Sequence, residues 1–157
     1  MDAVSIRHAL PRDKDKLQDV QRRASIVGET GETLRRLLTE PEHFDIDISM
    51  FDGEKILMAE IDGKPVGFAS YLPNSVDEAE LDGMFVDPDH WRRGIARSLL
   101  GSLARQLNSL GFARIRVVAN PNALEFYKSV GFDTVGAEVT PLGPSAPVMM
   151  RQLDTVA

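Results

Sequence analysis

A short basic loop joins a strand pattern to a helix pattern, and its residue types suit phosphate binding. The stretch Trp91–Ala96 reads Trp-Arg-Arg-Gly-Ile-Ala, and Arg97 follows it. The first backbone N–H groups of a helix have no partner inside the helix and lie at the positive end of its dipole. If the loop curls, these amides converge on one anion, and Gly94 permits a tight curl because it has no Cβ. The loop therefore predicts a site for a phosphorylated ligand; the alternative is a simple turn with solvated arginines.

The elements on either side of the loop must place it. The apolar run Ala79–Val86 predicts a strand, and Asp-Pro directly after it ends that strand. From Ile95 onward apolar residues recur at helical spacing as far as Leu107, which indicates a helix packed on a core. The next strand, Ala113–Ala119, is expected to lie parallel to the first through a right-handed crossover. Ligands in such sheets bind at the carboxyl ends of the strands, where the loop falls.

Two further pairs of polar residues lie near the ends of these two strands. Glu80 and Asp82 alternate with apolar or small residues, so they share one face of a strand. Two carboxylates on a central strand are unusual, and they are either base candidates or substrate-binding and exposed groups. Asn120 and Asn122 come directly after the next strand, where they either cap a helix or contact a ligand.

The element order read along the chain is βααβββαβαββ, which predicts an α/β (α+β) fold. We expect one domain over residues 1–157, with a mixed, mostly antiparallel central sheet of six to seven strands and helices on both faces. Asp62-Gly63 between two apolar runs is a strong hairpin signal. Glu42–Phe51 fits either a strand or an ordered loop, and Pro141–Pro144 is expected to turn the chain.

Composition excludes several classes of function. The chain has 157 residues and a net charge of −6, which argues against a broad nucleic-acid-binding face. It has no cysteine, which rules out disulfides and thiolate chemistry, and its three histidines lack the spacing of a metal site. No apolar run approaches the roughly 18 residues of a membrane span. Since the N-terminus lacks a secretory pattern, the expected location is the cytoplasm.

Two motifs are similar to those of a known family. Met84–Ala96 resembles a strand-plus-loop signature with a (Gln/Arg)-x-x-Gly-x-(Gly/Ala) core, and Ala119–Phe132 resembles Asn-x-x-Ala-x-x-Phe-Tyr-x-x-x-Gly-Phe. Both belong to the GNAT superfamily of acyl-CoA-dependent N-acetyltransferases, and the two motifs in this order are more specific than either alone. The chain departs from the pattern at Trp91, which occupies the Gln/Arg position.

The resemblance implies acetyl-CoA as a cosubstrate and no metal. Its pyrophosphate would lie on the amides of Arg93–Ser98, with the arginines near the outer phosphates. Its pantetheine arm would run along Met84–Val86 like an added strand. The implied coenzyme-binding residues are Met84, Phe85, Val86, Arg92, Arg93, Gly94, Ile95, Ala96, Arg97, Ser98, Asn120, Asn122 and Tyr127.

The implied reaction is direct attack of a primary amine, on a small molecule or a protein, on the thioester in a ternary complex. By resemblance, Tyr127 is the acid for the leaving thiolate; the alternative is core packing of the Phe-Tyr pair. Glu80 or Asp82 is the candidate base, directly or through water.

Other functions stay open on the sequence alone. The chain fits a non-catalytic acyl-CoA-binding sensor of the same fold. An acetyltransferase toxin that modifies charged tRNA is disfavoured by the net negative charge. The amine would be selected by Ser25–Phe51 and the turn near Pro141, which no motif describes. A homodimer through the C-terminal strand is possible, and no nucleic-acid or membrane partner is expected.

Overall fold

The computed structural model describes residues 3–140 and 145–153, so the predicted turn at 141–144 lies outside the described residues. Within these described residues, seven strands and four α-helices follow the predicted order βααβββαβαββ, and short 3-10 helices join them. The strands are β1 Val4–His8, β2 Ile56–Ile61, β3 Lys64–Pro73, β4 Glu78–Val86, β5 Arg114–Val118, β6 Asp133–Val139 and β7 Ser145–Gln152. The helices are α1 Lys14–Ile26, α2 Gly31–Thr39, α3 Ile95–Ser109 and α4 Leu124–Ser129.

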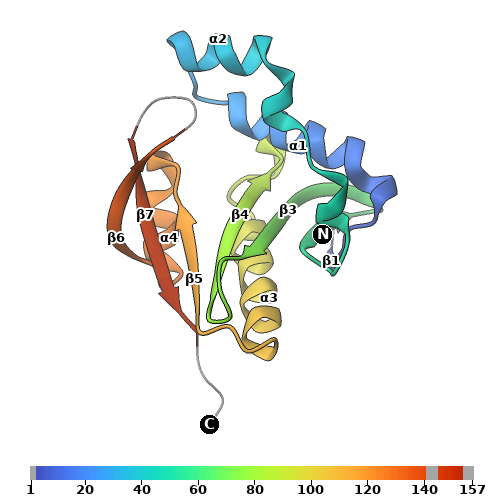
Figure 1. Cartoon of the computed structure of the whole chain (residues 1–157). Helices are drawn as coiled ribbons and strands as arrows, with labels where there is room; N and C mark the ends of the chain where they lie inside the picture. Colours follow the sequence, from blue (N-terminus) through green and yellow to red (C-terminus); the bar gives the residue numbers. More distant parts are fainter. Residues whose placement is uncertain (1–2, 141–144, 154–157) are drawn as a thin grey trace. The chain divides into compact units, whose positions relative to one another are not determined.

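The strands hydrogen-bond in the order β1-β2-β3-β4-β5-β7-β6 (Figure 1). The pairs β1/β2, β2/β3, β5/β7 and β6/β7 are antiparallel, whereas β4/β5 is parallel. The parallel pair is the one that α3 connects, as a strand–helix–strand crossover requires. The predicted mixed, mostly antiparallel sheet of six to seven strands is therefore confirmed.

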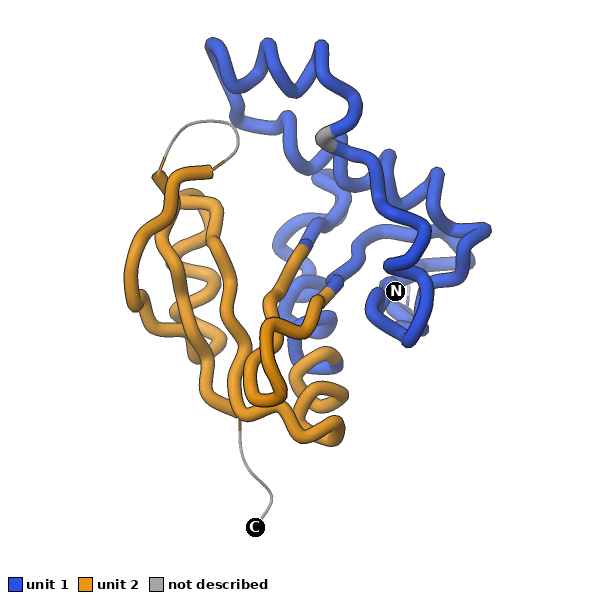
Figure 2. Tube along the Cα trace, viewed as in Figure 1, with its two compact units in different colours: residues 1–70, 83–102 blue, residues 71–82, 103–157 orange. Residues whose placement is uncertain are grey.

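The chain forms two compact units, coloured separately in Figure 2. Unit 1 contains residues 1–70 and 83–102, and unit 2 contains residues 71–82 and 103–157. The boundary falls inside β3, β4 and α3, so these elements contribute residues to both units. That the whole chain acts as one domain stays a prediction.

Unit 1 is built around a hairpin. Asp62 and Gly63 join β2 to β3 with φ of 51° and 76°. Positive φ at both central residues is what a two-residue hairpin turn of type I′ requires, so the predicted hairpin forms. The core of this unit includes Leu17 of α1, Met58 of β2 and Leu99 of α3, each with no exposed surface.

The segment between α2 and β2 does not form the strand that its period-two pattern suggests. Its apolar residues lie in two 3-10 helices, Pro41–Phe44 and Ile48–Phe51, except Ile46, which is buried between them. Phe44, Met50 and Phe51 are buried while the acidic residues between them are exposed. The alternation therefore reflects an ordered loop folded back on a core and not a strand.

Unit 2 contains β5, β7, β6 and α4. Ile115 of β5, Met149 of β7 and Phe132 just before β6 have at most 1% of their surface exposed, and they form its core with Leu103 and Leu107 of α3. Every residue of the edge strand β6 is exposed. The core of unit 2 thus includes residues of β5, of β7 and of the helices together with Phe132, and β6 itself contributes none.

Candidate functional site

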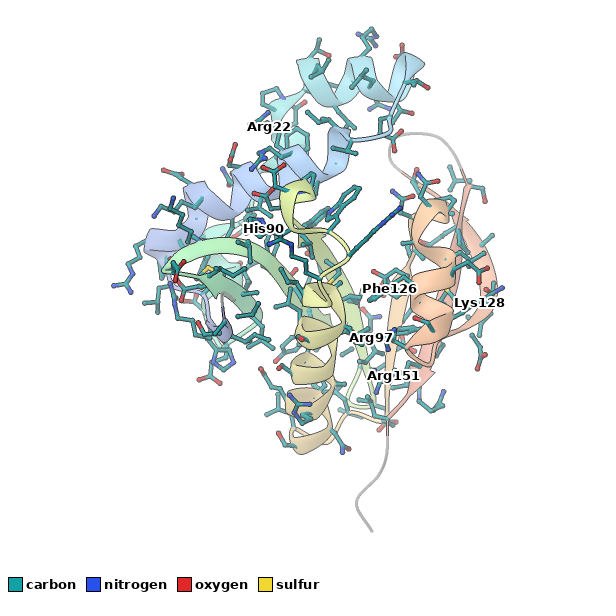
Figure 3. All side chains as sticks on the ribbon, turned by 180° about the vertical axis from the view of Figure 1, so that it is seen from behind. Arg22, His90, Arg97, Phe126, Lys128 and Arg151 are labelled. Carbon is teal, nitrogen blue, oxygen red and sulfur yellow. The ribbon has the colours of Figure 1, made fainter. Side chains whose placement is uncertain are left out.

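The basic loop, Trp91–Arg97, opens α3 on an exposed surface of unit 1. Arg92 and Gly94 have left-handed φ angles of 65° and 78°, so the chain curls before the helix begins. The helix N-terminus itself is anchored because Ile95 is only 2% exposed. Figure 3 labels Arg97 in this first turn of α3, on the surface of the helix.

The hydrogen bonds at the start of α3 show which backbone amides the helix itself uses. The first intrahelical bond runs from the Ser98 amide to the Gly94 carbonyl, at 3.0 Å. The amides of Ile95 and Ala96 precede that bond, which is the position of donors without helical partners. The Ser98 amide is used by the helix, so only its exposed hydroxyl can reach a ligand.

The departure at Trp91 has a structural consequence. The indole Nε1 donates a 2.7 Å hydrogen bond to the Val86 carbonyl at the end of β4. A Gln or Arg side chain at this position would also be a donor. The indole therefore keeps one donor but offers no further polar group. Trp91 therefore ties the start of the basic loop to the end of the strand.

The end of β4 is packed closely against β3 within unit 1. A Cβ on Gly67 would approach the Phe85 carbonyl to 3.0 Å, closer than nearly all real contacts. The Phe85 ring lies 5.5 Å from the Phe68 ring, and Val86 is 9% exposed. Met84 and Phe85 are half-buried. This packing holds the strand that leads into the loop.

In unit 2, charged side chains of β4, β5 and β6 form a group that we call the charged layer. The predicted carboxylates Glu80 and Asp82 are among its members on β4. Arg116 donates to Glu80 and to Glu138, each at 2.7 Å, and Asn74 donates to Glu80 at 2.8 Å. Glu78 is held in the same way by Asn74 and Arg114, and these bonds lower its pKa. The layer is a run of alternating positive and negative groups.

Asp82 differs from Glu80 although both lie on β4. No hydrogen bond to the Asp82 carboxylate occurs within the described part of the chain. Asp82 has exposed surface, yet its carboxylate is partly removed from solvent, and this desolvation raises its pKa. The negative charge of Glu80 raises the pKa of Asp82 further. A carboxylate with a raised pKa and no cationic partner is the better proton acceptor of the two.

The β4/β5 ladder stops beside these residues. Parallel pairing joins Glu78–Glu80 to Arg114–Arg116, and β5 continues to Val118 in register with β7. Leu81 and Asp82 therefore lie beyond the part of β4 that pairs with β5, although β4 has β3 as its neighbour on the other side. Unpaired main-chain groups at the end of a strand are a template for an extended amide chain.

Tyr127 lies on α4 and is 6% exposed. Its ring makes edge-to-face contacts with Phe126 and Phe132, at centroid distances of 5.4 Å and 5.3 Å. Burial raises the pKa of its phenol to about 12, so the hydroxyl is protonated at neutral pH. The two aromatic neighbours pack against the ring, so its position in unit 2 is set by these contacts.

Of the two asparagines, Asn120 caps the short 3-10 turn that leads into α4. The Asn120 side-chain oxygen accepts a hydrogen bond from the Asn122 amide at 2.9 Å, and the Asn122 side chain is exposed. Of the two readings of these residues, the capping one is present in this structure. The Asn120 amide nitrogen is not part of that cap and stays a donor for a ligand.

The predicted residues thus form two groups, one in each unit. Met84, Phe85, Val86 and the residues from Arg92 to Ser98 are in unit 1, whereas Glu80, Asp82, Asn120, Asn122 and Tyr127 are in unit 2. Sequence reasoning missed Arg114, Arg116 and Asn74. Their signal was present, because Arg-x-Arg on β5 faces Glu-x-Glu on a parallel neighbour.

Within the residues that the structure describes, there is neither a cluster of metal ligands nor a helix that could span a membrane. These residues contain no group of three or more His, Asp or Glu side chains arranged to hold a metal ion. Over the same ranges no helix is both long and apolar enough to cross a membrane.

A seven-stranded mixed sheet with one parallel pair, connected through a helix that opens on a basic curl, defines an α/β protein; the fold alone does not define a function. The model of the acetyltransferase (GNAT) family matches residues 24–132, so the chain belongs to this family. The resemblance drawn from the two sequence motifs is thereby confirmed.

Curated relatives match part of the chain. An uncharacterized N-acetyltransferase of Methanocaldococcus jannaschii is 33% identical over 91 residues, covering 52% of this chain and 40% of that protein. The ribosomal protein bS18-alanine N-acetyltransferase of Escherichia coli is 35% identical over 86 residues, covering 52% of this chain and 57% of that protein. The chain therefore spans about half the length of the curated relatives it matches.

Solved structures match nearly the whole chain. The PaiA N-acetyltransferase of Thermoplasma acidophilum, in complex with coenzyme A, has a TM-score of 0.76 at 20% identity and covers 96% of this chain and 99% of that one. The ribosomal-protein-S18-alanine N-acetyltransferase of Escherichia coli has a TM-score of 0.74 at 24% identity, covering 99% and 97%. At these identities the likeness concerns the fold.

Proposed function

We propose that this protein is an N-acetyltransferase that moves the acetyl group of acetyl-CoA to a primary amine. The observation that carries the proposal is the exposed start of α3, where the amides of Ile95 and Ala96 precede the first helical hydrogen bond and the exposed Arg92 and Arg93 lie on a left-handed curl. Its family membership and its coenzyme-bound structural neighbour support the same cosubstrate. In this proposal the pyrophosphate binds the first amides of α3, those of Ile95 and Ala96, and Arg92 and Arg93 attract the outer phosphates.

The proposed reaction is a direct attack in a ternary complex. A primary amine is protonated at neutral pH, since its pKa is near ~10.4, so it must first lose a proton. The nitrogen then attacks the thioester carbonyl, the C–N bond forms, and the C–S bond breaks. Acetylated amine and free CoA are the products. Much of the rate enhancement comes from holding the two substrates in line.

We propose distinct roles for the residues of unit 2. Asp82 accepts the amine proton, directly or through water, because its pKa is raised and it has no cationic partner. Glu80 is tied to Arg116 and sets the negative potential around Asp82. Tyr127 donates its proton to the leaving thiolate, since burial keeps the phenol neutral. Asn120 contributes its side-chain amide near the thioester, and Met84–Val86 pair with the pantetheine arm.

The first experiment is calorimetry with acetyl-CoA. Binding in the micromolar range is expected, and its absence would remove the proposal. A panel of amines then identifies the acceptor through the free thiol that each turnover releases. The panel should include small polyamines, lysine derivatives and peptides with an N-terminal alanine, because that residue is the acceptor named for the Escherichia coli relatives.

A protein that binds the coenzyme but acetylates nothing in the panel would be the non-catalytic alternative. The cytoplasm as its location and a homodimer through the C-terminal strand stay predictions, and cell fractionation and light scattering test them.

A further inference from the structure

The turn that leads from β4 into the basic loop is held by a residue far away in the chain. Arg23 of α1 places Nη1 2.5 Å from the Asp87 carboxylate and Nη2 3.0 Å from the Asp89 carboxylate. The contacts span 64 and 66 residues and lie inside unit 1. One guanidinium therefore bridges both acids of the entry turn, which we define as Asp87–His90.

Asp87 is the centre of this turn. Its amide donates to the Val66 carbonyl at 2.8 Å, and its other carboxylate oxygen accepts from the Asp89 amide at 3.0 Å. Its carbonyl accepts from the His90 amide at 2.8 Å. Asp87 is 8% exposed, and a buried carboxylate is costly unless a cation and hydrogen bonds satisfy it. Arg23 supplies that cation.

The basic loop starts directly after the entry turn. Trp91 follows His90, and Arg92 has the left-handed φ that turns the chain toward the helix. A shift of the entry turn is therefore passed to the amides of Ile95 and Ala96. Preorganised donors bind more tightly than donors that must be ordered on binding.

We propose that Arg23 is a positioning residue for coenzyme binding, which holds the entry turn so that the loop amides face the pyrophosphate. This inference rests on the proposed function. It predicts that Arg23 acts on the phosphate-bearing part of the ligand and not on the pantetheine arm.

The test compares Arg23→Met with Arg22→Met. Arg22 is the neighbouring arginine on the same helix; it pairs with Asp19 within α1, and Figure 3 labels it. Both variants remove one positive charge, but only Arg23→Met releases the entry turn. Calorimetry with coenzyme A should show affinity about tenfold weaker for Arg23→Met, since a charge-assisted pair is lost, and no change for Arg22→Met.

A second ligand separates positioning from general damage. Pantetheine lacks the pyrophosphate, so its binding, measured by competition, should be the same in Arg23→Met and the wild type. Arg23→Lys keeps the charge but cannot bridge both carboxylates, so its coenzyme A affinity should fall between the two.

The outcomes are distinguishable. If the wild type does not bind coenzyme A, the proposed function itself fails. If the wild type binds but Arg23→Met equals Arg22→Met, only the role of Arg23 is refuted. Equal weakening of coenzyme A and pantetheine would also refute it, because it would show a loss of structure and not of loop position.

Discussion

The basic loop and the charged layer are both predicted to handle charge, but they are built differently. In the loop the predicted contacts are main-chain amides, which are placed by backbone angles and by the buried Ile95. In the layer the predicted contacts are side chains, whose roles depend on their partners. Glu80 and Asp82 are two residues apart on one strand, yet one is paired and the other is not.

Because the loop uses main-chain groups and the layer uses side chains, the two regions should differ in which substitutions they tolerate. A main-chain site survives a change of side chain as long as the backbone keeps its curl, which explains how Trp91 can occupy a position that is usually Gln or Arg. A side-chain site changes its chemistry when any partner changes. Substitutions in the loop and in the layer should therefore have different effects.

The largest effect is expected at Tyr127. Tyr127→Phe removes only the hydroxyl and keeps the ring between Phe126 and Phe132, so the fold and coenzyme binding should persist. Loss of a general acid should lower kcat about 100-fold. Steady-state kinetics with the acceptor identified from the amine panel measures the change.

Tyr71→Phe is the matched control for this substitution. Tyr71 is the other tyrosine of the chain, is 6% exposed in the same unit, and packs edge-to-face on Phe112. Its kcat should equal that of the wild type. A Tyr127→Phe enzyme with full activity would show that Tyr127 only fills the core.

The second effect separates the two carboxylates by pH. Asp82→Asn should lower kcat about tenfold or more, because the proposed base is lost. Glu80→Gln should keep most activity but shift the acid limb of the pH–rate profile to lower pH. Its negative charge helps to raise the pKa of Asp82, so removing that charge lowers this pKa. Rates from pH 5 to 9 give both limbs.

The control is Asp133→Asn, which neutralises an exposed carboxylate on β6 of the same unit and should leave the profile unchanged. If Glu80→Gln abolishes activity while Asp82→Asn does not, the two roles are reversed.

Much of the fold was readable from the sequence because its signals are local. Asp62-Gly63 fixed the hairpin, and the 3.6-residue apolar period after Ile95 fixed α3. The curl at Gly94 was readable for the same reason, since glycine marks a positive φ. Glu42–Phe51 was not decided, because a short 3-10 helix and a strand can bury apolar residues at similar spacing.

The partners in the site were not readable because they join distant parts of the chain. Arg116 meets Glu80 only once the β4/β5 register is known, and Arg23 meets Asp87 only once α1 is placed. Without these contacts, Glu80 and Asp82 are two equivalent carboxylates on one strand. The structure makes them different by giving a cation to one of them.

The smallest effect tests the main-chain side of the comparison. Gly94 has a φ of 78°, and a Cβ there would meet no atom within 4 Å. Gly94→Ala therefore meets no clash and costs only the left-handed backbone, about 1 kcal/mol, so coenzyme affinity should fall about fivefold if the loop relaxes. Gly136→Ala is the matched control, since Gly136 also has open space around it but an ordinary φ.

Calorimetry with coenzyme A and chemical denaturation follow the two glycine variants in parallel. A loss of affinity in Gly94→Ala, without the same loss in Gly136→Ala, would show that the curl and not the side chains makes the phosphate site. Unchanged affinity would contradict this prediction, because it would show that coenzyme binding does not depend on a glycine at position 94.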